Sequence, residues 1–205
     1  MTSSMYQVRF HGRGGQGVVT GAELLSVAAF LEGHYSQAFP SFGSERMGAP
    51  VAAFCRIHSE PIRLREPVVY PDALIVQDAS LVRNPDLLAG LERVRVVVVN
   101  TRLTLTELQA PSLKERVGSQ RILCLPATEM ALKGLGRNVP NVAMLSAFCA
   151  LSGLIGFDAL AQAVRNKFSE KVADANLRVA EQAWTWVDRT GLSSVYPIET
   201  GVIHV

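Results

Sequence analysis

A glycine-rich segment near the start of the chain constrains the fold more than any other feature. It follows an alternating apolar pattern at residues 5–10 and precedes a helical pattern at residues 15–31, which predicts strand, loop and helix. Gly12, Gly14 and Gly17 match the G-x-G-x-x-G spacing in that setting. Glycine lets another group approach the backbone, and the N-terminus of the following helix attracts anions. The segment predicts either an anion site or tight packing of strand against helix.

Two nucleotide-binding classes are disfavoured by the residues around this loop. A dinucleotide site needs an acidic residue about 20 residues beyond the glycines, yet residues 36–44 contain no carboxylate and the next is Glu45. A Walker loop needs Gly-Lys-Ser/Thr after its glycines, and that tripeptide is missing. The remaining interpretation is a loop that holds another phosphate-bearing group, with Arg13 close enough to help.

Short apolar runs continue the alternation of strands and helices. Strands are expected at residues 35–39, 51–57, 73–77, 94–99 and 121–125, with a helix at 80–91. A hairpin arm at residues 62–64 would make the sheet mixed. This order predicts a three-layer α/β/α, Rossmann-like domain.

The last third of the chain is expected to be helical. Helices are predicted at residues 128–135, 141–152, 158–168 and 170–189. Asn141 and Asp158 are predicted N-caps, and the predicted helix ends are Gly136, Gly153 and Gly191. The helix at 141–152 is apolar nearly all round, which predicts burial in the core or against another subunit. We expect one domain over residues 1–191 and a tail over residues 192–205.

A second loop, over residues 39–50, carries an unusual concentration of aromatic and charged residues. Its candidate contact residues are Phe39, Phe42, Glu45 and Arg46. Aromatic side chains on a rigid loop are typical of a surface that meets a partner or a ligand. The alternative is a loop folded over the core of its own domain.

Composition excludes several functions. Hydrophobic residues make up 48% of the chain and charged residues 19%, with a net charge of +2, which predicts a globular protein and no nucleic-acid partner. No apolar run is long enough for a membrane span and no signal peptide is visible, so a cytoplasmic protein is expected. Three separated cysteines, Cys55, Cys124 and Cys149, are predicted to be buried reduced thiols.

The titratable residues form no recognisable catalytic set. The four histidines lack metal-site spacing, and no catalytic triad or paired carboxylates are visible. His11 enters the glycine loop and is the one histidine expected to face a ligand, while the others are expected at the surface. We therefore predict no metal site and no catalytic residue in this chain.

Several ordered blocks of the sequence resemble one family. They are Gly12–Thr20, Gln37–Gly43, Glu45–Val51, Pro71–Asp78, Val99–Thr101 and Asn141–Leu145. Together they closely resemble the gamma subunit of 2-oxoacid:ferredoxin oxidoreductases, over nearly the whole chain. Family members often carry Glu-Arg-Arg-Gly-Ala-Pro, and this chain has Met47 at the second arginine. The motifs of this chain are more similar to those of the pyruvate and aryl-oxoacid branches of the family than to those of the 2-oxoglutarate branch.

The resemblance implies a role in a multi-subunit enzyme. Such a complex oxidatively decarboxylates a 2-oxoacid to an acyl-CoA and passes electrons to ferredoxin or another acceptor. Thiamine diphosphate, magnesium and [4Fe-4S] clusters would belong to alpha, beta and delta partner subunits. This chain would help to bind coenzyme A and enclose the active site. The expected coenzyme A residues are Gly12, Arg13, Gly14, Gly15, Gln16, Gly17 and Thr20.

Two other functions remain open at this point. One is a stand-alone nucleotide-binding domain, which the missing ribose carboxylate disfavours. The other is a purely structural assembly subunit whose glycine loop binds nothing.

Overall fold

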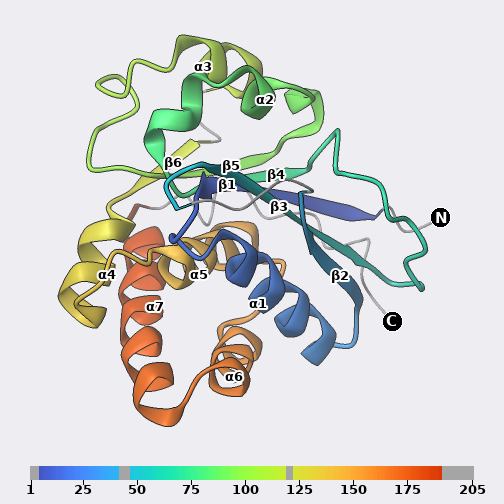
Figure 1. Ribbon diagram of the computed structural model, residues 1–205, viewed down its shortest axis with the longest axis vertical. Coiled ribbons are helices and arrows are strands. Elements are labelled where there is room, and N and C mark those ends of the chain that lie inside the picture. The colour runs from blue at the N-terminus through green and yellow to red at the C-terminus, as the bar shows by residue number, and fades with distance from the viewer. Residues whose placement is uncertain (1–4, 42–46, 119–121, 191–205) are drawn as a thin grey trace.

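A six-stranded sheet forms the middle of three layers in the computed structural model, which describes residues 5–41, 47–118 and 122–190 (Figure 1). The strand order is β2-β3-β1-β4-β5-β6. The strands are β1 (Tyr6–Arg13), β2 (Tyr35–Pro40), β3 (Pro50–His58), β4 (Ala73–Val76), β5 (Val96–Asn100) and β6 (Ile122–Leu125). The predicted α/β fold is confirmed. The expected tail, residues 192–205, lies outside the described residues.

The sheet is mixed, but not for the reason expected from the sequence. β1, β4, β5 and β6 run parallel, whereas β3 pairs antiparallel with both β1 and β2. The predicted hairpin arm at residues 62–64 is wrong, because that segment forms no strand. Pro61 and Pro67 flank a largely exposed, charged stretch, and proline cannot donate a hydrogen bond to a sheet.

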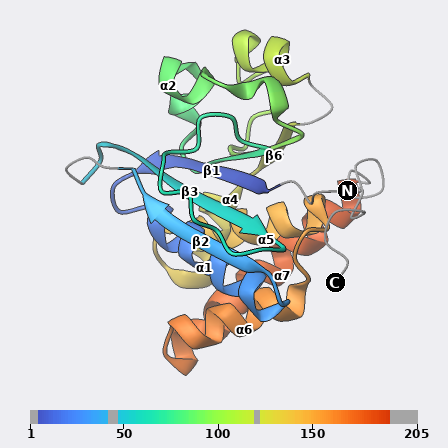
Figure 2. The same ribbon diagram turned by 90° about the vertical axis from the view of Figure 1, so that its right-hand side faces the viewer.

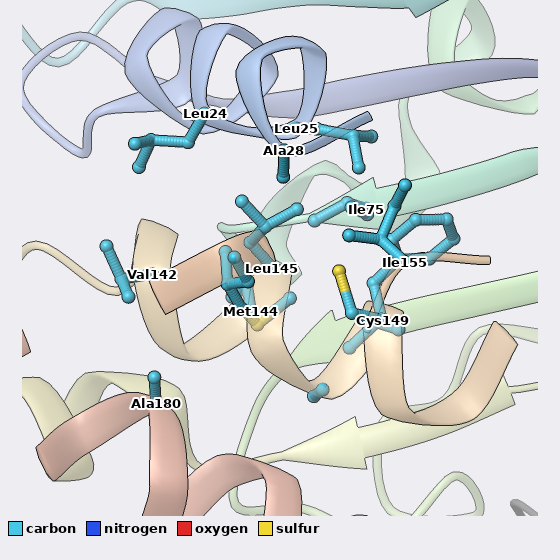
Figure 3. Packing of buried hydrophobic residues seen from close by; sticks show 14 of the residues in the cluster. Leu24, Leu25, Ala28, Ile75, Val142, Met144, Leu145, Cys149, Ile155 and Ala180 are labelled. Carbon is cyan, nitrogen blue, oxygen red and sulfur yellow. The ribbon is translucent and has the colours of Figure 1, made fainter. Parts of the chain in front are cut away.

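Five helices cover one face of the sheet. They are α1 (Val18–Leu31), α4 (Ala127–Leu135), α5 (Asn141–Ser152), α6 (Phe157–Lys167) and α7 (Glu170–Thr190). α5 lies between the sheet and α7 and is buried almost throughout (Figure 1). Its all-round apolar sequence is therefore explained by the core of this chain. Figure 3 shows Leu145 of α5 between Leu25 of α1 and the core beneath.

The opposite face carries a smaller and more irregular layer. It consists of η1 (Ala79–Arg83), α2 (Pro85–Leu88), η2 (Leu91–Arg93) and α3 (Pro111–Val117), above the sheet in Figure 2. The single helix predicted at residues 80–91 is wrong. Pro85 begins a new helix, and Gly90 has a φ of +70°, so the segment divides into short pieces. The helix α3 had not been predicted.

Two predicted helix caps are also wrong. α5 and α6 are preceded by Pro140 and Gly156, and neither has a side-chain cap. Asn141 instead sends its amide toward Gly17, as described below. The predicted ends at Gly136 and Gly153 are confirmed, because both adopt the left-handed conformation. Gly191 lies outside the described residues.

Candidate functional site

The glycine loop connects β1 directly to α1 and bends sharply at two residues. Gly15 has a φ of +93° and Gly17 a φ of +73°, a region that other residues rarely adopt. Gly17 is the N-cap of α1 and has no side chain to cover the free N–H groups of the first turn. The expected strand, glycine loop and helix are present, with the helix N-terminus open.

The glycines of this loop have different physical roles. A Cβ atom on Gly12 would lie 2.6 Å from Val18 Cγ2, so Gly12 permits the packing of strand against helix. A Cβ atom on Gly17 would lie 2.5 Å from Asn141 Nδ2, whose amide donates to the Gly17 carbonyl at 3.2 Å. At Gly15 the nearest atoms belong to the end of the Met47 side chain. The packing role therefore accounts for Gly12 and Gly17 but not for the exposed Gly15.

A network of side chains holds the loop in place. Gln16 accepts a hydrogen bond from the Arg13 amide at 2.8 Å and donates to Asp78 at 3.2 Å. The Arg13 guanidinium pairs with Asp78 at 3.2 Å and donates to Ser80 Oγ and the Gly48 carbonyl. The Arg13 side chain is therefore held within the chain, and several of its N–H groups already donate hydrogen bonds.

Asp78 is the ionised centre of this network. Burial raises the pKa of its carboxyl group, but hydrogen bonds from Ser80 and Gln16 and the charge of Arg13 outweigh burial. Its pKa is consequently below the ordinary value. The Asp78 carboxylate thus ties the loop to the segment that follows β4.

A cavity of about 380 Å³ opens beside the glycine loop. It is lined by Arg13, Gly14, Gly15, Gly17, Val18, Val19, Thr20, Val51, Arg137, Val139, Asn141 and Phe168. Five of the seven predicted coenzyme A residues therefore lie together, whereas Gly12 and Gln16 do not line it. Sequence reasoning missed Arg137, which is exposed and has no ion-pair partner among the described residues.

The cavity continues into a second one of about 430 Å³, which shares Arg137, Val139, Asn141 and Phe168 with the first. Lys171 and Arg178 of α7 line this part. Neither forms a salt bridge with any described residue. An open helix N-terminus and three unpaired cations along one groove favour an elongated anion.

A larger cavity of about 670 Å³ lies between α4 and α7. Its lining contains the carboxylates Glu129 and Glu181 as well as the cations Lys133, Arg178 and Arg189. This mixture of charges is less suited to a polyanion than the groove at the glycine loop, which has no carboxylate in its lining.

The predicted contact loop at residues 39–50 is described only in part. Phe42, Glu45 and Arg46 lie outside the described residues. Phe39 is half-buried and packs at 5.2 Å from the ring of Phe54, with the Arg56 guanidinium also 5.2 Å from the Phe39 ring. Beyond the undescribed part, the Gly14 amide donates to the Ala49 carbonyl at 2.9 Å. A hydrogen bond between backbone groups therefore connects the glycine loop to the segment at residues 39–50.

The histidines and cysteines differ partly from expectation. His11 is buried and lies outside the groove at the glycine loop. The prediction that His34 lies at the surface is wrong, because His34 is buried at the turn between α1 and β2. Cys55 and Cys149 are buried free thiols, and Cys124 is half-buried. Burial raises the pKa of all three thiols, which disfavours reactive thiolates.

Within the described ranges, no group of histidine, cysteine or carboxylate residues is arranged to hold a metal ion. The described helices also include none with the length and apolar character needed to cross a membrane.

Known proteins resemble this chain in sequence and in fold. The model of the pyruvate ferredoxin/flavodoxin oxidoreductase family matches residues 7–186. Pyruvate synthase subunit PorC of Methanothermobacter marburgensis is 44% identical over 187 residues, which is 91% of this chain and 100% of the relative. The common gamma subunit of the pyruvate/ketoisovalerate oxidoreductases of Pyrococcus furiosus is 43% identical, over 88% of this chain and 96% of the relative.

Solved structures of oxidoreductase subunits share the fold of this chain. Pyruvate oxidoreductase subunit PORC of Thermotoga maritima superposes with a TM-score of 0.73 at 32% identity, covering 88% of this chain and 96% of that one. A 2-oxoglutarate:ferredoxin oxidoreductase from Magnetococcus marinus shares the fold with a TM-score of 0.69 at 18% identity, covering 90% of this chain and 31% of that one. This chain therefore belongs to the pyruvate ferredoxin/flavodoxin oxidoreductase family, among its gamma subunits.

Proposed function

We propose that this chain helps to bind coenzyme A and to enclose the active site of a complex that oxidises a 2-oxoacid. The substrate would be pyruvate or an aryl 2-oxoacid and the product an acyl-CoA. Thiamine diphosphate, magnesium and [4Fe-4S] clusters would be held by alpha, beta and delta subunits, with ferredoxin or another protein as acceptor. The cytoplasmic location stays a prediction.

The groove at the glycine loop supports this proposal. Coenzyme A is elongated and carries a pyrophosphate and a separate ribose phosphate, so it needs cationic or N–H donors at more than one place. Gly15 and Thr20 lie at one part of the groove, and Lys171 and Arg178 at the other, with Arg137 shared between the two. Backbone N–H groups at the start of α1 would receive one phosphate and the α7 cations another. Enclosure of the active site rests on the family resemblance and on the aromatic loop.

Gly15→Val in the assembled complex tests the glycine loop. A side chain there would press against the end of Met47 and displace the loop that lines the cavity, so the apparent affinity for coenzyme A should fall while that for the 2-oxoacid is retained. Gly33→Val is the matched control, because Gly33 also has a positive φ, +88°, but faces open space. Equal coenzyme A dependence in the two variants would leave the glycine loop with a packing role alone.

Arg137→Gln tests the cation that sequence reasoning missed. Loss of one charge-assisted hydrogen bond to a phosphate should raise the KM for coenzyme A by about 10-fold or more. Arg102→Gln provides the comparison, because Arg102 is exposed, pairs with Glu129 at 2.9 Å and lies outside the groove. The KM for coenzyme A should be unchanged in Arg102→Gln, and a similar change in both variants would contradict a specific phosphate contact.

A further inference from the structure

A fourth cavity, on the face of the sheet opposite α1, is not used by the coenzyme A proposal. It measures about 300 Å³ and is lined by Arg9, His11, Ser41, Pro50, Val51, Ala52, Phe54, Val68, Leu81, Asn84 and Asp86. We propose that this His11 cavity receives a neutral hydrogen-bonding side chain, an amide or a hydroxyl, from a companion subunit. This proposal rests on the proposed function, because companion subunits are present only if the chain is part of such a complex.

The cavity exists because the helical layer on this face does not reach the whole sheet. The apolar cluster under η1, α2, η2 and α3 includes residues of β4, β5 and β6 but none of β1, β2 or β3. On β1, Val8 and Phe10 point into the main core, so the alternate residues Arg9 and His11 point to this second face. In the register of the sheet, Arg9 lies opposite Phe54 and His11 opposite Ala52 of β3.

Polar groups at this face lack hydrogen-bond partners among the described residues. His11 is 9% exposed and its Nε2 atom is buried without a partner. Arg9 Nε and Arg56 Nη1 are also buried without partners, although other nitrogens of both side chains donate to backbone carbonyls. Buried polar atoms are nearly always paired in folded proteins. Arg56 does not line the cavity, but His11 and Arg9 do, and their unpaired Nε2 and Nε atoms indicate a missing occupant.

The surrounding charges define the chemistry of that occupant. Burial, followed by the charge of Arg9, lowers the pKa of His11 to about 3, so its imidazole is neutral. Burial lowers the pKa of Arg9 to about 10, and the charge of the Asp86 carboxylate acts in the opposite direction and partly offsets the positive charge. A neutral group with a hydrogen-bonding atom suits such a site, and Phe54 and Leu81 contribute apolar wall.

Its position favours a protein occupant over a small molecule. Next to β3, β2 is the last strand of the sheet, and no other strand within the described residues pairs with its outer side, which could meet another chain. Phe39 of β2, half-buried beside Arg56, lies in register with Phe54 at the cavity wall. Ser41, which directly follows β2, also lines the cavity and belongs to the segment at residues 39–50 that the sequence predicts as a contact surface. The cavity therefore lies next to the edge strand.

The first experiment co-expresses this chain with its companion subunits and measures the dissociation constant of the complex. His11→Phe replaces the imidazole by an apolar ring of similar shape. The isolated variant should have an unchanged or higher Tm, because an unpaired polar group is lost, while its binding to the companions weakens by about 10-fold or more. His34→Phe is the matched control, since it alters another buried histidine outside the cavity, and it should assemble normally.

Ala52→Trp provides an independent variant, because its indole would fill the cavity without removing any polar group. Its isolated form should keep the wild-type circular dichroism spectrum and should fail to assemble. Wild-type affinity in both His11→Phe and Ala52→Trp would overturn the proposal and leave the coenzyme A proposal standing. Failure of the wild-type chain itself to assemble would instead contradict the proposed function.

A spectroscopic measurement separates a protein occupant from a small one. With ¹⁵N-labelled histidine, the Nε2 resonance of His11, assigned by its absence in His11→Phe, should shift when the companion subunits bind. The same resonance should stay unchanged when pyruvate or coenzyme A is added to the isolated chain. A shift caused by either small molecule, with none on assembly, would assign the cavity to a ligand and overturn the proposal.

Discussion

The two faces of the central sheet differ in what their side chains do. On one face, Val8 and Phe10 of β1 are fully buried in the apolar core beneath α1 and α5. On the other, Arg9 and His11 of the same strand sit beside an open cavity with unpaired nitrogen atoms. Alternation along one strand thus separates a face that stabilises the fold from a face that retains unused hydrogen-bonding capacity.

Leu145→Ala and Leu113→Ala should give the largest effects and test the difference between the faces. Both leucines are fully buried, one in the core beneath α5 and the other in the smaller cluster at α3. We expect Leu145→Ala to lower the free energy of unfolding by about 3–5 kcal/mol, and Leu113→Ala by about 2–3 kcal/mol, because the irregular layer relaxes more readily. Urea denaturation of the two variants would measure this. An equal or reversed order would contradict the comparison.

Arg9→Met tests whether the polar face also contributes to stability. The Arg9 guanidinium donates to the Leu87 and Ala89 carbonyls at 2.6 and 2.9 Å, which fixes α2 over the sheet. Its removal should cost about 1–3 kcal/mol in urea denaturation. Arg9→Lys is the control, because an ammonium keeps the charge but cannot reproduce the planar fork. Full stability of Arg9→Lys would show that charge alone matters here.

Asp78 should give the smallest effect, and one that depends on pH. Its pKa is lower in the folded chain than the ordinary 3.8, so its carboxylate stabilises the fold above that pH. This contribution, about 1 kcal/mol, should be lost as the pH falls below about 4. The difference in unfolding free energy between wild type and Asp78→Asn should therefore shrink with acidification. A difference that is constant from pH 7 to pH 3 would contradict this assignment.

Much of the fold could be predicted from sequence, because local patterns decide strands and helices. The six strands and the helices α1 and α4–α7 follow from apolar periodicity and glycine positions. The predictions of helix boundaries were wrong where a proline, a glycine or a side-chain contact interrupted the apolar pattern. Pro85 and Gly90 divide one expected helix. The Asn141 side chain donates to the Gly17 carbonyl and does not cap its own helix.

The candidate site could be predicted in part. The glycine loop and Thr20 were visible because they occupy one continuous segment, and the cavity beside them contains Gly14, Gly15 and Gly17. Arg137, Lys171 and Arg178 come from distant segments with no shared motif, so no sequence signal brings them together.

By itself the sequence determined the strand–glycine loop–helix unit, the α/β alternation and the family, since these depend on residues that are neighbours along the chain. Only the tertiary structure decided that Gly12 serves packing, that Arg137 from the α4–α5 connection and two cations of α7 join the loop, and that His11 lies beside a different cavity. The physical reason is that cavities and unpaired polar atoms arise where layers meet or stop short. Those boundaries are set by packing between segments far apart in sequence.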